Sequence, residues 1–181
     1  MSVPYLTGKL VGLRALTLAD AAHAAAWARG PLPINATRAE AFLKETHTDP
    51  WNPRRRYLAM VRVGDGEIVG GAAVSGANGR TGKLDVWAAP WFSPEEGDRL
   101  CADAVRVAVP WLRDDNELMT VTFAVPADAA ATIRAAEDLG MVLGATFREH
   151  VARPGGRVDL LEYQALNSGW TIPVIEEASG A

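Results

Sequence analysis

The chain has 181 residues, of which 49% are apolar and 22% are charged. This length favours a single folded domain with one sizeable core. Acidic residues outnumber basic ones by 22 to 18, and the formal net charge is −4. The longest basic run is Arg54-Arg55-Arg56. This composition argues against nucleic acid and anionic membrane surfaces as partners.

The N-terminus and the cysteine content indicate the compartment. Residues 1–10 lack the basic and apolar regions of a secretory signal, and no apolar run approaches the roughly 20 residues of a membrane span. We therefore expect a cytoplasmic protein. The single cysteine, Cys101, excludes an internal disulfide and a cysteine-based metal site, and we expect a buried packing thiol. None of the three histidines has metal-ligand spacing, so no metal is expected.

The first third of the chain predicts one strand and two helices. Residues 9–14 read as a short strand. An alanine-rich helix is expected from Thr17 to Trp27, because Gly30-Pro31 stops it. Thr37 and Glu40 have the spacing of a capping box, which predicts the start of a second helix.

Three strands should come next. Residues 57–63 and 67–75 are predicted to form an antiparallel hairpin, because the glycines of Gly64-Asp65-Gly66 suit a tight turn. A further turn at Asn78-Gly79 leads to a strand over residues 83–88.

A long amphipathic helix is predicted to begin at Ser93. Ser93 suits the N-cap and Pro94 the first helical position, while Glu96 has the spacing that completes a capping box. Leu100, Ala104 and Ala108 recur at four-residue spacing on one apolar face. Pro110 should kink or tighten the last turn.

The remainder predicts a strand, a helix and a long hairpin. These elements cover residues 118–125, 127–139, 141–151 and 157–166, and Gly155-Gly156 forms the hairpin turn. The order of elements predicts an α/β (α+β) fold with a mixed, mainly antiparallel sheet of six to seven strands flanked by helices. We expect a single domain over residues 1–170 and a frayed tail over residues 171–181.

The strand at 83–88 and the helix after it have the layout of an anion site. The first backbone N–H groups of a helix are unpaired, and its dipole end is positive. Here Ser93, Glu95 and Glu96 are expected to occupy that end with their own oxygen atoms. The sequence therefore combines an anion-binding architecture with side chains that oppose anions.

Three segments resemble the GNAT superfamily of acyl-CoA-dependent N-acyltransferases, in particular its RimJ/RimL branch. They read LTGKLVGLRALTLADAAHAAAW, GEIVGGAAV and AEDLGMVLGATFREHVARPGGRVDLLEYQAL, and the resemblance spans roughly Leu6 to Trp170. It implies the GNAT fold, with acyl-CoA in a V-shaped cleft between the fourth and fifth strands. It also implies acetyl-CoA as co-substrate, a primary amine of a small molecule or a peptide N-terminus as acceptor, and often a homodimer.

The resemblance also implies where the cofactor binds. The pantetheine arm should pair with the strand ending at Ala88, which makes Val86, Trp87 and Ala88 candidate contacts. The family's pyrophosphate turn, Gln/Arg-x-x-Gly-x-Gly/Ala, aligns through Gly97 with residues 94–99. Gly97, Asp98, Arg99 and Leu100 are therefore the candidates on the helix. Pro94 and Arg99 depart from this turn, because the first lacks an N–H and the second replaces a glycine. Arg99 and Arg106 could instead bind phosphate through their side chains.

A second departure lies in the helix after the fifth strand. Relatives often have Asn-x-x-Ser there, whereas this chain has Ala129 and Thr132. The Thr132 hydroxyl is a candidate to face the departing thiolate, although it could instead bond back to its own helix. Asp128 is the neighbour that could replace the amide lost at Ala129.

Acylation of an amine also needs a proton acceptor. Relatives often place a carboxylate six residues after the glycine at 144, where this chain has His150. An imidazole with an ordinary pKa near 6.5 suits this role, although a strand histidine without a role is the alternative. Asp85 is the other candidate base, but strand alternation could point it away from the cleft. Trp51 and Trp91 lie in predicted loops that could wall an acceptor pocket.

The sequence leaves two functions open. The first is an acyl-CoA-dependent N-acyltransferase without a metal, which the resemblance, Thr132 and His150 support. The second is a GNAT-fold protein that no longer uses acetyl-CoA normally and serves as a binding module or runs different chemistry in the same cleft. The self-capped helix and Ala129 favour the second. Fold alone does not decide between them.

Overall fold

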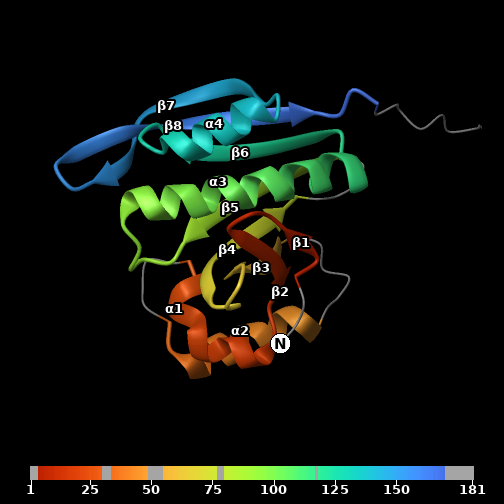
Figure 1. Ribbon diagram of the computed structural model, residues 1–181, viewed down its shortest axis with the longest axis vertical. Coiled ribbons are helices and arrows are strands. Elements are labelled where there is room, and N and C mark those ends of the chain that lie inside the picture. Colours follow the sequence, from red (N-terminus) through yellow and green to blue (C-terminus); the bar gives the residue numbers. More distant parts are fainter. Residues whose placement is uncertain (1–3, 30–33, 49–54, 77–79, 117, 170–181) are drawn as a thin grey trace, which may run out of the picture.

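An eight-stranded sheet runs through the computed structural model, which describes residues 4–29, 34–48, 55–76, 80–116 and 118–169 (Figure 1). The strand order is β1-β2-β3-β4-β5-β6-β8-β7. The strands are β1 (Leu6–Thr7), β2 (Val11–Ala15), β3 (Arg55–Arg62), β4 (Ile68–Ser75), β5 (Thr81–Ala88), β6 (Thr120–Pro126), β7 (Val142–Arg153) and β8 (Gly156–Leu166). Within the described ranges, β5 and β6 form the one parallel pair. The predicted mixed, mainly antiparallel sheet is therefore confirmed. It has eight strands and not six to seven, because the two residues of β1 are too few to show an alternating pattern in the sequence.

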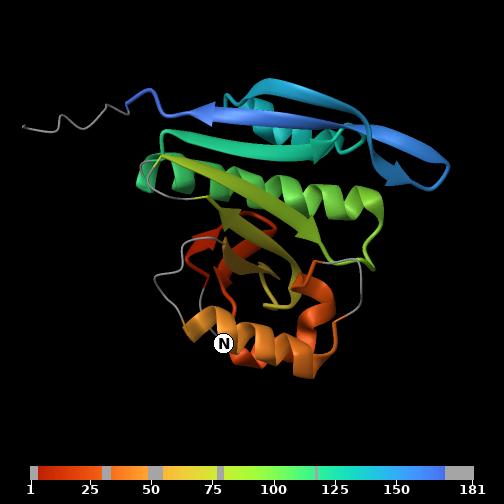
Figure 2. The ribbon, with the colours of Figure 1, turned by 180° about the vertical axis from the view of Figure 1, so that it is seen from behind.

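The helical segments lie on both sides of this sheet. They are the 3₁₀ helix η1 (Leu18–His23), α1 (Ala24–Trp27), α2 (Ala36–Thr48), α3 (Pro94–Pro110), the π-helix η2 (Trp111–Asp115) and α4 (Ala130–Asp138). α1 and α2 lie on the opposite side of the sheet from α3 and α4 (Figures 1 and 2). None of the described helices is long and apolar enough to cross a membrane.

Strand alternation divides the buried residues between these two layers. On β3, Leu58 and Met60 pack toward α3, whereas Ala59 and Val61 pack toward α1 and α2. The α3 side holds the larger core, where Leu84 is fully buried. This two-sided core fixes the faces of β5, and so decides which of its side chains can reach each side of the sheet.

Two predicted helix boundaries need correction. The backbone N–H of Arg38 donates to the Asn35 side chain at 2.8 Å, so Asn35 caps α2 and the predicted capping box at Thr37 and Glu40 is wrong. Asn35 lies one position before the first helical residue, where its short side chain reaches the free N–H groups. The helix predicted to start at Thr17 begins as a 3₁₀ turn instead, with the Thr17 amide donating to the Asp20 carboxylate.

Pro110 changes the end of α3 on both sides. The Trp111 amide donates to the Ala108 carbonyl three residues back, which tightens the last turn as predicted. The next turn is wide, because the Asn116 amide donates to the Trp111 carbonyl five residues back, at 3.0 Å. The glycine turns behave as predicted, since Gly64, Gly66, Gly140 and Gly155 all have positive φ. The predicted turn at Asn78-Gly79 and the tail lie outside the described residues.

Candidate functional site

The two parallel strands at the centre of the sheet separate part-way along their length. β5 and β6 pair from Thr81 with Thr120 to Leu84 with Phe123, and both strands continue beyond that point. Residues 85–88 remain paired with β4, but their other edge has no partner strand among the described residues. A strand edge of this kind presents free N–H and C=O groups to an extended ligand. The gap lies between the two strands where the resemblance places the acyl-CoA cleft.

The N-terminus of α3 closes one end of this gap. Gly97 is buried, and a Cβ atom built there would lie 3.2 Å from the Cβ of Ala88. A larger residue would therefore push the helix away from the end of β5. Leu100, one turn further on, is 7% exposed and belongs to the core. Of the four residues predicted on this helix, Gly97 and Leu100 thus have a packing role whether or not a ligand binds.

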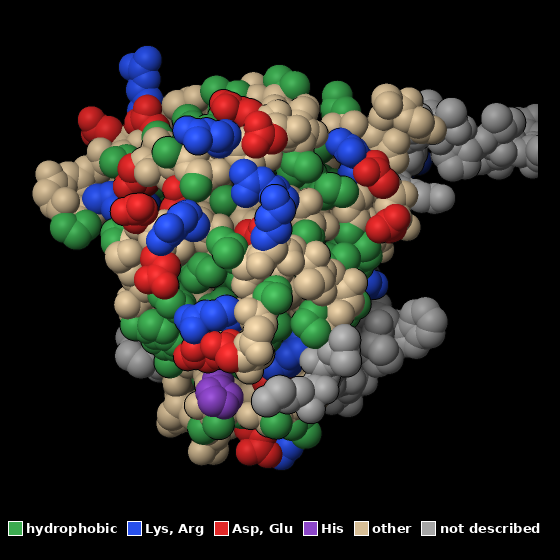
Figure 3. All heavy atoms as spheres, in the orientation of Figure 1, with side chains coloured by type: hydrophobic (Ala, Val, Ile, Leu, Met, Phe, Trp, Pro, Cys, Tyr) green, Lys and Arg blue, Asp and Glu red, His purple; other side chains and the backbone are tan. Residues whose placement is uncertain are grey.

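The first turn of α3 uses most of its own hydrogen-bond donors. Ser93 is the N-cap, and its hydroxyl accepts from the Glu96 amide at 3.2 Å. Pro94 occupies the first turn and has no N–H, and the Gly97 amide donates to the Ser93 carbonyl. Glu95 and Glu96 are exposed. Acidic and basic side chains are interspersed on the face that carries α3 and α4, so this face attracts anions only weakly (Figure 3).

Asp98 connects α3 to the N-terminus of α4. Its carboxylate accepts hydrogen bonds from the backbone amides of Ala131, at 2.7 Å, and Thr132, at 3.0 Å. The Thr132 hydroxyl donates to the same carboxylate at 2.6 Å. Ala129 is the N-cap residue of α4 and has no side chain that could cap it. The Asp98 carboxylate of α3 therefore caps α4, because the sequence at the start of α4 has no side chain that can do so.

The other side of β5 faces α1. Asp85 is half-buried and shares this side with Trp87, whereas Val86 and Ala88 pack toward the α3 core. The Trp87 indole N–H donates to the Trp27 carbonyl at 3.1 Å, and Arg29 lies 5.8 Å from the centre of the Trp87 ring. Asp85 is the first residue of β5 beyond its pairing with β6. The gap therefore has a carboxylate and an indole on its α1 side.

His150 lies on β7, which is not one of the two strands that bound the gap. It is exposed on β7, and β8 separates β7 from β6 in the sheet. β7 and β8 project beyond the other strands at this end (Figures 1 and 2). The strand bulges around Glu149, which has φ +49°, and the His150 ring lies 5.7 Å from the Phe147 ring. The structure thus gathers residues 85–88, 97–100 and 129–132 at the gap and leaves His150 on the projecting hairpin.

A comparison with solved structures finds a chain of the same architecture. The crystal structure of a protein from Sphaerobacter thermophilus, described as an acetyltransferase, is 43% identical in sequence. The match covers 92% of this chain and 99% of that chain, with a TM-score of 0.71. The chain belongs to the GNAT superfamily. No family model matches the sequence, and no curated protein matches it either.

More distant GNAT structures share the fold. A ribosomal-protein-S5-alanine acetyltransferase of Vibrio fischeri is 15% identical, and the match covers 94% of this chain and 100% of that chain with a TM-score of 0.69. RimJ of Mycobacterium smegmatis, solved in complex with CoA-disulfide, is 14% identical over 89% of this chain and 84% of that chain, with a TM-score of 0.64. These proteins include the RimJ branch that the sequence resembles.

Neither Asp128 nor Cys101 offers a reactive side chain. The Asp128 carboxylate, considered as a replacement for the amide lost at Ala129, is held by the Arg153 guanidinium at 2.7 and 3.1 Å. Burial and the charge of Asp98 raise the pKa of the Cys101 thiol to about 12. The thiol stays protonated at neutral pH and is a packing group. Among the described residues, no three His, Cys, Asp or Glu side chains lie together to hold a metal ion.

The Asp98 cap is the feature of this site that sequence reasoning missed. The one signal was a helix that begins Ala-Ala-Ala-Thr without a capping residue of its own, which requires an acceptor from elsewhere. Which residue supplies that acceptor depends on how α3 packs against α4. Asp128, the nearest acidic residue in sequence, is committed to Arg153.

Replacing Asp98 with alanine should destabilise the protein. The variant leaves the Ala131 and Thr132 amides without their acceptor, which should cost about 2 to 3 kcal/mol, and the Thr132 hydroxyl keeps only the Asp98 backbone carbonyl, at 3.1 Å. Urea unfolding measures the change. Asp138→Ala is the matched control on α4, because its ion pair with Arg106 is long, at 3.7 Å, and exposed. Equal losses in the two variants would contradict a structural role for Asp98.

Proposed function

We propose that this chain is an acetyl-CoA-dependent N-acetyltransferase, with a primary amine of a small molecule or a peptide N-terminus as acceptor. The observation that carries the proposal is the stretch of β5 beyond its pairing with β6, residues 85–88, beside the N-terminus of α3 in a GNAT chain. The pantetheine arm would bind as an added strand along Val86, Trp87 and Ala88. The 43% identical acetyltransferase structure supports acetyl as the transferred group.

The pyrophosphate would depend more on side chains than on helix N–H groups. Three of the first backbone positions of α3 are already used or lack a donor. Arg99 is exposed one turn into the helix, so its guanidinium can reach a phosphate bound there. Arg106 lies two turns further along and pairs with Asp138. We therefore assign the phosphate contact to Arg99 and a supporting role to Arg106.

In the reaction, the amine nitrogen attacks the thioester carbonyl carbon and the C–S bond breaks. An N–C bond forms, the amine loses a proton to a base, and the CoA thiolate leaves and gains a proton. The position of Asp85 at the opening of the gap, on the side facing α1, supports it as the base ahead of His150. Thr132 is 2% exposed and its hydroxyl is held by Asp98, so it could serve the thiolate only by exchanging that partner.

Acetyl-CoA binding tests the proposal directly. Ligand at about 100 times its Kd adds about 2.7 kcal/mol, which should raise the Tm of a chain of this size by roughly 5 to 10 °C. Differential scanning fluorimetry measures the shift, and calorimetry gives the Kd. If neither detects binding at millimolar acetyl-CoA, the acetyltransferase proposal fails and the GNAT fold here serves binding or a different chemistry.

The acidic side chains at the start of α3 should weaken that binding. Replacing Glu95 and Glu96 together with glutamine removes two negative charges beside the phosphate position and should tighten acetyl-CoA binding several-fold at low ionic strength. Calorimetry at low and high salt measures the effect, which salt should reduce. Glu40→Gln on α2, on the other side of the sheet, is the matched control. An unchanged Kd in the double variant would show that these acids do not oppose the phosphates.

A further inference from the structure

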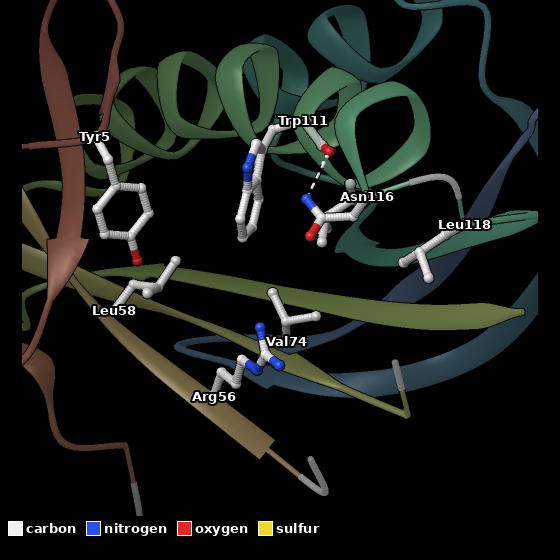
Figure 4. Close-up of a pocket in the computed structure, with 8 residues that line it drawn as sticks. Tyr5, Arg56, Leu58, Val74, Trp111, Asn116 and Leu118 are labelled. Carbon is white, nitrogen blue, oxygen red and sulfur yellow. Dashed lines mark hydrogen bonds between the residues drawn. The ribbon is translucent and has the colours of Figure 1, made fainter. Parts of the chain in front are cut away.

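A cavity lies at the opposite end of α3 from the gap. Its volume is about 380 Å³, and it is bounded by the sheet, the π-turn after α3 and the segment before β1 (Figure 4). α3 has 17 residues and is therefore about 25 Å long, with the gap at its N-terminus and this cavity at its C-terminus. The cavity and the gap are separate sites, so binding in this cavity does not depend on the proposed function.

The walls of this cavity are apolar and aromatic. Leu58 and Val74 of the sheet form its floor, and Leu112 and Leu118 close one side. Tyr5 and Trp111 both line it and contact each other, with ring centres 6.1 Å apart and a tilt of 46°. The π-turn holds Trp111 in place, because the Trp111 carbonyl accepts hydrogen bonds from both the backbone and the side-chain amide of Asn116. The cavity thus has a stable surface for a flat apolar group.

Arg56 introduces a positive charge into this apolar setting. It lies two residues before Leu58 on β3, so strand alternation directs it to the α3 side, where Leu58 and Met60 are core residues. Its side chain rises toward Trp111 (Figure 4). Within the described ranges, no carboxylate forms an ion pair with Arg56. Burial raises the pKa of the nearby Tyr5 hydroxyl, and the positive charge of Arg56 opposes this increase.

We infer that this cavity binds a planar, mainly apolar carboxylic acid. The ligand's carboxylate forms a bidentate ion pair with the Arg56 guanidinium, and its ring packs against the wall formed by Trp111 and Tyr5. The Asn116 side-chain amide donates to the Trp111 carbonyl at 2.9 Å, which fixes this polar group at the edge of the cavity. A volume of about 380 Å³ is at the lower end of the range for small-molecule sites, which suits one bicyclic ring system with its acid group.

The test uses 2-naphthoate as the probe. The control ligand is 2-naphthamide, which has the same shape but no charge. Titration calorimetry of the full chain should show that naphthoate binds at least about tenfold more tightly than the amide. Arg56→Gln should weaken naphthoate binding by about tenfold or more and leave amide binding unchanged. Arg38→Gln, on exposed α2, is the control and should bind naphthoate as the wild type does. Because Arg56 is exposed at a strand end, a Tm measurement suffices to confirm that Arg56→Gln folds.

NMR locates the probe. Naphthoate should shift the indole N–H signal of Trp111, assigned with Trp111→Phe, and leave the Trp91 indole signal and the amides of residues 85–88 unchanged. The inference is overturned if naphthoate does not bind at millimolar concentration, if Arg56→Gln binds it as tightly as the wild type, or if the shifted signals belong to the β5 gap.

Discussion

Replacing Asp85 with asparagine is expected to lower kcat for amine acetylation by about 10²- to 10⁴-fold, the range that a positioned general base contributes. Asp85 is the first residue of β5 beyond its pairing with β6 and lies on the α1 side of the strand, where an acceptor amine would reach the thioester. Asparagine keeps the size of the side chain but cannot accept the proton. Release of the CoA thiol at saturating amine and acetyl-CoA measures kcat.

His150→Ala is the matched comparison for this experiment. Because His150 is exposed on the projecting hairpin, its loss should leave kcat close to the wild-type value from about pH 6 to pH 9. The Kd for acetyl-CoA, measured by calorimetry, should change in neither variant, which separates binding from chemistry. A full rate in Asp85→Asn together with a large loss in His150→Ala would instead identify His150 as the base.

Replacing Asp20 with alanine should lower the free energy of unfolding by about 3 to 5 kcal/mol, the cost of leaving one partner of a buried ion pair alone. The Asp20 carboxylate accepts from the Arg14 guanidinium at 2.7 and 2.8 Å, and the two side chains are 7% and 11% exposed. The variant would leave the Arg14 charge buried beside the start of η1. Urea unfolding at neutral pH measures the loss. Asp65→Ala is the control, because it removes an exposed ion pair with Arg62 and should change the unfolding midpoint far less.

The Asp20 pair should also make stability depend on pH. Burial raises the pKa of the Asp20 carboxyl, but the hydrogen bonds from Arg14 and Thr17 together outweigh it, so the pKa lies below its ordinary value. A carboxyl with a lowered pKa contributes stability above its unfolded pKa, about 3.9, and loses it as pH falls through the folded value. The difference between wild type and Asp20→Ala should therefore be constant above about pH 5 and shrink below pH 4. A constant difference down to about pH 2 would exclude this electrostatic origin.

The sequence predicted those features of the fold that depend only on residues close together in the chain. Ser93 and Pro94 start α3 because capping and the fixed φ of proline act on neighbouring residues. Gly64, Gly66, Gly140 and Gly155 mark turns because these positions need positive φ. The order of these elements, together with three sequence segments, identified the GNAT resemblance and the strand that lines the gap.

The tertiary structure alone decided which side chains meet at that gap. Asp98 caps α4 from 33 residues away, and Arg153 binds Asp128 from 25 residues away, so both contacts depend on how helices and strands pack. Strand pairing placed β8 between β6 and β7, so His150 lies two strands from β6, and Asp85 lies where β5 and β6 separate. Arg56 and Trp111 meet at one cavity for the same reason. Local preference determines where an element begins and ends, but contacts between distant residues arise only when the layers pack.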